Sequence, residues 1–302
     1  MPGLSAALAL LIADPLILGA QQMLPPPLLP PTPVEDVDHI AGHGDSAERM
    51  TVPVAVQGSG PYRFLIDTGS QRTVVSTAVA DRLALVAGPS IKVVGIAGVD
   101  QVATAHVEEI AFGQQSVAGL TVPLLDDRHM GADGIIGTDS LQDQRVVLDF
   151  GRETITIGTP RELGSTSGYE IVVRARRRSG RLILTDALID GVRTDVVVDT
   201  GAQGTIGNLA LQRALRAKAT GKGSLTSATG QVMPADFGVA GQLKLGSLQV
   251  GNVLIAFADG PAFTELKLHD RPAIFLGMHE MRAFNRIAID FSSHKVFFDV
   301  SR

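Results

Sequence analysis

The chain contains no cysteine and no tryptophan, has only two tyrosines, and is poor in charge. Without cysteine it has no disulfides, no thiolate metal site and no cysteine nucleophile, so its chemistry depends on oxygen and nitrogen groups. Charged residues make up 19% of the chain and the net charge is −5, which disfavours a nucleic acid bound through its phosphates. Because aromatic residues reach only 4%, the core must be built mainly from Val, Ile, Leu and Ala.

What is present is sufficient for two domains. The 302 residues are 45% apolar, and a chain of this length commonly divides into domains of about 130 to 150 residues. From Met50 onward, short β-prone runs alternate with turn signals, as in Thr51–Val56 followed by Gln57–Gly60. Short helices are expected at residues 77–84, 138–142, 208–218 and 278–283. The sequence therefore predicts a mostly β protein.

The first 33 residues differ in composition from the rest. An apolar run over residues 4–12, resumed at 16–20, resembles a secretory signal with a small-residue cleavage site near Ala20, or a membrane anchor. No Lys or Arg precedes it, and Asp14-Pro15 interrupts it. Six prolines between Pro25 and Pro33 then predict an extended linker. We expect an exported protein, periplasmic or membrane-anchored through this segment, with a cytoplasmic location as the alternative.

An internal repeat organises the remainder. The segment FLIDTGSQ at residues 64–71 recurs as VVVDTGAQ at 196–203, an offset of 132 residues. Three further landmarks recur in the same order, namely Gly98 and Gly230, residues 133–137 and 273–277, and residues 146–150 and 287–291. Such ordered self-similarity predicts a tandem duplication. We expect residues 34–160 to form an N-terminal lobe and residues 161–302 a C-terminal lobe.

Each copy of the repeated motif places an aspartate at the end of an apolar strand. Three apolar residues precede Asp67 and Asp199, and a Thr-Gly turn follows each. One isolated carboxylate would be costly to bury there. Two carboxyls brought together by pseudo-twofold symmetry share a proton and titrate as a pair. Such a pair supplies a base that takes a proton from water and an acid that polarises a scissile carbonyl.

The doubled Asp-Thr-Gly motif, with an apolar-apolar-Gly segment after each copy, resembles the aspartic proteases. The resemblance covers residues 50–300 and is to two retropepsin-like units, of the bacterial type, fused in one chain. It implies an all-β, bilobal acid-protease fold made of two pseudo-twofold-related β-barrel lobes. It also implies an aspartic endopeptidase that hydrolyses peptide bonds with a water activated by an Asp67/Asp199 dyad. A catalytically silent peptide-binding module of the same fold is the alternative.

The resemblance also implies which substrate the protein takes, whether it needs a cofactor, and what the residues around the dyad do. The substrate is a polypeptide, no cofactor and no metal is required, and the protein is a monomer that acts as a fused pseudo-dimer. Thr68 and Thr200 interlock across the two loops, and Gly69 and Gly201 bring backbone N–H groups to the carboxylates. The Ser70 hydroxyl reaches an outer carboxylate oxygen, which the equivalent Ala202 cannot do, so the two aspartates differ in environment.

Two further pairs of segments follow from the same resemblance. Residues 135–137 and 275–277 thread beneath the catalytic loops, and residues 93–99 and 225–231 form flaps that close over the peptide. The flap residues expected to contact substrate are Gly95, Ile96, Ala97, Gly98, Ala228, Thr229 and Gly230. Neither Tyr62 nor Tyr169 lies in a flap, which separates the chain from the pepsin type. After the threading segments, Thr138-Asp139 half-fits the retroviral pattern and Met278-His279 does not.

The remaining polar motifs are interpreted as structural. Asp149 and Asp290 also repeat, but each lies inside an alternating strand. His39 and His43 have helical metal-ligand spacing, yet neighbouring glycines argue against a helix and favour a solvated linker. The arginine run over residues 174–181 is interpreted as an exposed hairpin tip rather than a binding patch for an anionic partner. Residues 220–224 are interpreted as the approach to the second flap.

Overall fold

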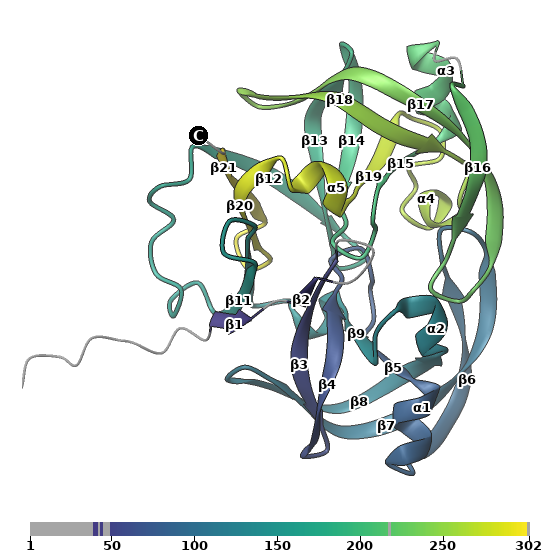
Figure 1. Cartoon of the computed structure of the whole chain (residues 1–302), viewed down its shortest axis with the longest axis vertical. Helices are drawn as coiled ribbons and strands as arrows, with labels where there is room; N and C mark the ends of the chain where they lie inside the picture. The colour runs from purple at the N-terminus through teal and green to yellow at the C-terminus, as the bar shows by residue number, and fades with distance from the viewer. Residues whose placement is uncertain (1–38, 42, 45–48, 217–218, 301–302) are drawn as a thin grey trace, which may run out of the picture. The chain divides into compact units, whose positions relative to one another are not determined.

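The computed structural model describes residues 39–41, 43–44, 49–216 and 219–300 (Figure 1). Within them the chain forms two sheets, of 8 and 13 strands, with five short α-helices. The expected secretory signal, membrane anchor and proline-rich linker of residues 1–33 lie outside the described residues. The prediction of a mostly β protein is confirmed.

The first repeat supplies fourteen elements of secondary structure. In chain order they are β1 His39–Ala41, β2 His43–Gly44, β3 Met50–Val56, β4 Ser59–Ile66, β5 Val74–Ser76, α1 Thr77–Arg82, β6 Val86–Val94, β7 Val99–Phe112, β8 Gln115–Leu125, α2 Asp127–Met130, β9 Gly134–Ile136, the 3-10 helix η1 Thr138–Ser140, β10 Arg145–Asp149 and β11 Thr154–Gly158.

The second repeat follows the same succession. Its elements are β12 Ile171–Arg178, β13 Arg181–Ile189, β14 Val192–Val198, β15 Thr205–Gly207, α3 Leu209–Leu215, β16 Gly221–Thr226, β17 Val232–Leu245, β18 Leu248–Phe257, α4 Pro261–Glu265, β19 Ala273–Leu276, α5 Met278–Met281, β20 Phe284–Asp290 and β21 Lys295–Val300. Helices α2 and α4 were not expected from the sequence, and the four expected helical segments are each shorter than expected.

The two repeats fold into lobes of the same topology. The first lobe has the strand order β3-β4-β9-β5-β8-β7-β6, and the second has β13-β14-β19-β15-β18-β17-β16. An additional pairing closes each lobe on itself, β3 with β7 and β13 with β17. In both lobes the strand before the aspartate runs parallel to the threading strand, β4 with β9 and β14 with β19. The duplication found in the sequence is therefore a duplication of the fold.

A shared sheet joins the two repeats. Its order is β1-β11-β10-β20-β21-β12, and the central pair, β10 with β20, is antiparallel and comes from different repeats. Arg145 on β10 forms a 2.9 Å ion pair with Asp290 on β20, and both side chains are buried. Asp149, at the end of β10, instead accepts a hydrogen bond from the Arg152 backbone at 2.9 Å. The lobe boundary at residue 160 stays a prediction, because strands on both sides of it share this sheet.

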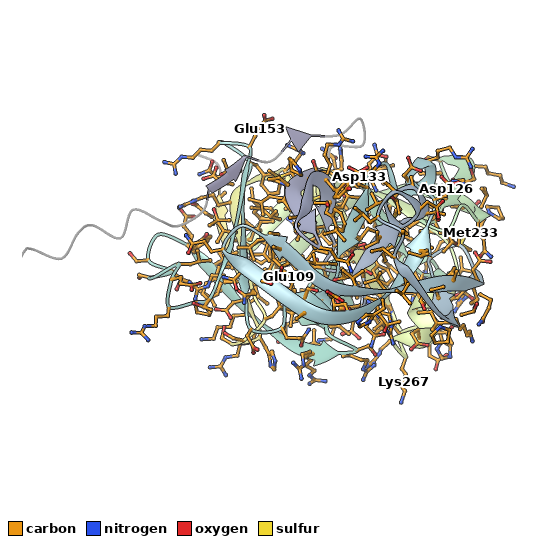
Figure 2. The ribbon with its side chains drawn as sticks, turned by 90° about the horizontal axis from the view of Figure 1, so that it is seen from below. Glu109, Asp126, Asp133, Glu153, Met233 and Lys267 are labelled. Atoms are coloured by element: carbon orange, nitrogen blue, oxygen red, sulfur yellow. The ribbon has the colours of Figure 1, made fainter. Side chains whose placement is uncertain are left out.

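The apolar core is built mainly from aliphatic side chains. One cluster extends from Met50 to Phe298 and contains residues of both repeats. A smaller cluster lies in each lobe near the threading strand, around Met130 in the first and around Phe263 in the second. Charged side chains such as Glu153 and Lys267 are exposed and project outward (Figure 2). His39 and His43 lie in strands β1 and β2, which corrects the expected linker.

Candidate active site

Both Asp-Thr-Gly segments lie at the carboxyl ends of buried strands. β4 ends at Ile66 and β14 at Val198, so Asp67 and Asp199 are the first residues of the following loops. The backbone N–H of Asp67 donates to the Ile136 carbonyl at 3.0 Å. That of Asp199 donates to the Leu276 carbonyl at 3.1 Å. The threading strands β9 and β19 thus hold the backbone of each aspartate in place at the point where its loop begins.

The two threonines hold the loops together across the lobes. The N–H of Thr68 donates to Thr200 Oγ1 at 3.1 Å, and the N–H of Thr200 donates to Thr68 Oγ1 at 3.2 Å. The Thr68 hydroxyl donates to the Val198 carbonyl at 2.7 Å, and the Thr200 hydroxyl donates to the Ile66 carbonyl at 2.5 Å. Both side chains are buried. Each hydroxyl therefore both donates and accepts across the lobe interface.

Each carboxyl is oriented by two backbone N–H groups of its own loop. Asp67 Oδ1 accepts from Gly69 and Ser70, both at 2.8 Å. Asp199 Oδ1 accepts from Gly201 at 3.0 Å and from Ala202 at 3.1 Å. The two carboxyls are close enough to change each other's acidity. One oxygen of each aspartate is thus held by its loop, and the pair meets between the lobes.

The glycine of each loop lies against the aspartate of the other. A Cβ atom on Gly69 would overlap the Asp199 carboxyl, and one on Gly201 would overlap the Asp67 carboxyl. Neither glycine has a positive φ, so the constraint at these positions is space and not backbone conformation. Only glycine lets the two carboxyls come this close.

Burial and proximity change the acidity of both aspartates. Burial raises the pKa of Asp67, while the N–H groups of Gly69 and Ser70 partly oppose the rise. Burial, together with the neighbouring charge of Asp67, raises the pKa of Asp199 to about 8. The charge of Asp67 raises the pKa of Asp199 and not the reverse, so the single proton of the pair lies on Asp199 near neutral pH. Two close carboxyls that cannot both ionise provide one acid and one base.

The source of this asymmetry differs from the one expected. The Ser70 hydroxyl does not reach a carboxylate and instead donates to the Arg72 carbonyl at 2.8 Å. The expectation for Ser70 was wrong, because its side chain turns back along its own loop. The difference lies in the backbone donors, which are closer to Asp67 than to Asp199.

A cleft of about 710 Å³ opens above the two aspartates. Both lobes line it, including the flap segments 93–96 and 224–229 and His129 of α2. Helix α2 begins after Asp126, which Figure 2 labels. The Asp126 side chain accepts from the Arg128 N–H at 2.9 Å. A groove of this size between two lobes is typical of a ligand site.

The two flaps are hairpins whose ribbons approach each other (Figure 1), and both line the cleft. The first joins β6 to β7 and the second joins β16 to β17. The Gln231 amide donates to the Val99 carbonyl at 3.2 Å, linking the two turns. The expected flap residues that line the cleft are Gly95, Ile96, Ala228 and Thr229. Those that do not line it are Ala97, Gly98 and Gly230.

A carboxylate supports the catalytic loop in each lobe, exposed in the first repeat and buried in the second. Asp139 accepts from the Thr73 hydroxyl at 2.7 Å, and Glu280 accepts from the Thr205 hydroxyl at 2.5 Å. Both threonine hydroxyls also accept from the glycine N–H that ends the threading strand. Met278-His279 carries no acid, yet the second repeat supplies one from the next residue. One extra residue after Gly277 moves the acid from the expected position, His279, to Glu280.

Arg181 is a site residue that the sequence interpretation missed. It was placed in an exposed hairpin tip, but it is only 8% exposed and lines the cleft. The hairpin turn Ser179-Gly180 packs against Thr138 of the first repeat. The Arg181 Nε then donates to the Gly69 carbonyl. The sequence does contain a pattern that could have identified Arg181, because Arg49 and Arg181 stand at the same 132-residue offset as the aspartates.

Two features are absent from the part of the chain that the structure describes. No group of three or more His, Asp or Glu within that part of the chain is arranged to hold a metal ion. No helix there is long and apolar enough to cross a membrane.

Two closed β lobes of one topology, with paired Asp-Thr-Gly loops meeting at the floor of a cleft, define a single-chain acid-protease fold. A comparison with protein families agrees with this class. The model of a family described as aspartyl protease matches residues 52–140 and 185–279, which is more than half of the chain. The chain belongs to this family, and its two matched segments correspond to two tandem retropepsin-like repeats. No curated protein matches the sequence.

Proposed function

We propose that the protein is an aspartic endopeptidase whose dyad is Asp67 and Asp199. One observation carries the proposal: two carboxyls, one from each repeat, lie against the opposite loops at the floor of a cleft that both lobes line. Family membership supports a protease of the aspartic type. The interlocked Thr68 and Thr200 add the rigidity that such a site needs.

The proposed mechanism uses the unequal acidity of the pair. Asp67, ionised near neutral pH, takes a proton from a water molecule bound between the carboxyls. Asp199 carries the shared proton and donates a hydrogen bond to the scissile carbonyl oxygen. The water oxygen forms a bond to the carbonyl carbon. The carbonyl oxygen receives the proton of Asp199, which gives a tetrahedral intermediate with two hydroxyl groups. The proton on Asp67 then passes to the amide nitrogen, and Asp199 takes a proton back from one hydroxyl of the tetrahedral intermediate. The C–N bond breaks, the products are an amine and a carboxylic acid, and the dyad again holds one proton on Asp199.

The flaps complete the proposed site. Both turns contain small residues and lie over the cleft, so an extended peptide enters when the Gln231–Val99 hydrogen bond opens. Closing a lid excludes water and strengthens the electrostatic interactions beneath it. We also propose that the protein acts as a monomer on polypeptides, because one chain supplies both aspartates. Export and membrane anchoring stay predictions.

Peptide hydrolysis tests the proposal. The chain is incubated with a peptide mixture, with and without a statine-type inhibitor, whose hydroxyl mimics the attacking water. Cleavage that the inhibitor blocks, and that Asp67→Asn and Asp199→Asn each abolish, is the expected result. Asp149→Asn, a strand-end aspartate outside the cleft, is the matched control and keeps wild-type activity. Peptide binding without any cleavage contradicts the proposal and favours the catalytically silent binding module.

A further inference from the structure

A buried arginine lies beside the dyad, and the proposed hydrolysis does not use it. Arg181, the first residue of β13, lines the cleft and is 8% exposed. Its Nε donates to the Gly69 carbonyl. Its Nη1 is buried and has no hydrogen-bond acceptor in the part of the chain that the structure describes. A buried charged donor without an acceptor is unfavourable, so it indicates a role in the complex with a ligand.

Besides the dyad, basic side chains outnumber acidic ones along the cleft. Besides the dyad, the ionisable residues that line it are Arg49, His129, Arg181, His279 and Glu280. Glu280 is committed to the Thr205 hydroxyl within its own lobe. Glu265 on α4 attracts Arg181 electrostatically, but it is exposed and does not line the cleft. The cleft wall thus offers positive charge to a bound chain.

Comparison of Arg181 with its symmetry counterpart shows how the two arginines differ in position and hydrogen bonding. Arg49 is its counterpart in the first repeat, 18 residues before Asp67 as Arg181 is 18 before Asp199. Arg49 donates its Nη2 to the Met130 carbonyl at 2.7 Å. Arg181 has the deeper position, next to the catalytic loop of the opposite lobe, and carries the unpaired Nη1.

We propose that Arg181 is a specificity residue that binds the carboxylate of an acidic side chain close to the scissile bond, so that acidic peptides are the preferred substrates. The inference rests on the proposed endopeptidase function. An acidic side chain entering beside an ionised dyad would be repelled unless a cation accompanied it. A guanidinium with a free N–H supplies both the charge and a directed hydrogen bond.

Two simpler roles for Arg181 make different predictions. If it only supports the Gly69 loop, its replacement lowers kcat/KM by the same factor for every peptide. If it only offsets the negative charge of the dyad, its replacement moves the pH optimum and leaves substrate choice unchanged. A specificity role changes the ratio between an acidic peptide and its neutral isostere, which neither of the other roles does.

The test compares matched peptides that differ only in Glu or Gln at one position, scanned through the residues on both sides of the scissile bond. Wild type is expected to prefer Glu at one such position by at least about tenfold in kcat/KM. Arg181→Gln reduces that ratio to about one, while Arg181→Lys keeps part of it. Arg193→Gln removes an arginine that is 77% exposed and is the control that leaves the ratio unchanged.

The outcomes separate this inference from the proposed function. A wild-type Glu/Gln ratio near one at every position overturns the inference, as does an unchanged ratio in Arg181→Gln. Cleavage of the neutral peptides still supports the endopeptidase in both cases. If no peptide is cleaved, the proposed function fails, and the inference is then tested by binding. Fluorescence anisotropy must show tighter binding of the Glu peptide than of the Gln peptide, and Arg181→Gln must remove the difference.

Discussion

Replacing Asp199 by asparagine is expected to stabilise the folded protein at alkaline pH while abolishing hydrolysis. Burial, with the charge of Asp67 beside it, raises the pKa of Asp199 from its ordinary value of 3.8 to about 8. The unfolded chain therefore binds fewer protons than the folded chain between these two values. Stability that is present at acid pH is lost as the pH rises through the folded-state pKa.

The size of the effect follows from the pKa. A rise of about four pH units corresponds to at most about 6 kcal/mol, since one unit is worth about 1.4 kcal/mol. Asp199 is half-buried, at the floor of an open cleft, so solvent screening reduces the effect to about 1 to 3 kcal/mol. Asp199→Asn avoids this cost, and the asparagine oxygen still accepts from the Gly201 N–H.

Urea unfolding measures this prediction. The free energy of unfolding of Asp199→Asn, relative to wild type, should increase by about 1 to 3 kcal/mol between about pH 5 and about pH 9. Asp186→Asn is the control, because that side chain is 77% exposed and pairs with the surface residue Arg193. If the difference between Asp199→Asn and wild type were the same at both pH values, the raised pKa would be refuted.

Three further substitutions test the packing of the site and of the shared sheet. Gly201→Ala pushes a methyl group into the Asp67 carboxyl and should lower kcat/KM by about 100-fold. Gly221→Ala, where a Cβ meets open space, is the control and should leave kcat/KM unchanged. Equal effects of the two substitutions would contradict the steric argument. Thr200→Val leaves two buried backbone groups without partners and should cost about 1 to 3 kcal/mol in urea unfolding, and a cost near zero would show that the interlock is dispensable. Arg145→Met leaves the buried carboxylate of Asp290 without its ion-pair partner and should lower the free energy of unfolding by about 3 to 5 kcal/mol. The prediction fails if replacing both Arg145 and Asp290 costs as much as the two single replacements together.

The parts of the site that repeat in sequence could be predicted from it. Asp67 and Asp199, with the glycines that follow them, belong to one local motif copied at a fixed offset, and each copy follows an apolar strand. Local order of this kind determines which strand carries the aspartate and which segment threads beneath it. The fold class followed from the resemblance of the doubled motif to the aspartic proteases, and the family match agrees with it.

The parts that depend on contacts between the repeats were harder to predict. The arginine run of β12 and β13 looks like a solvated hairpin, and only the folded chain brings its turn against Thr138 and Arg181 against Gly69. Glu280 was missed because a single extra residue after Gly277 breaks the register between the repeats. Pairing of β10 with β20 likewise joins two strands whose sequences are typical of any half-buried strand.

The pH dependence of peptide cleavage tests the central claim, that Asp67 and Asp199 share one proton in a single active site. For one peptide, kcat/KM of wild type should be bell-shaped, rising where Asp67 ionises, above pH 3.8, and falling near pH 8 where Asp199 loses its proton. Asp67→Asn and Asp199→Asn should each retain less than about a thousandth of the wild-type maximum. A wild-type rate that does not fall above about pH 8, or a variant that keeps a tenth of the activity, would contradict the account.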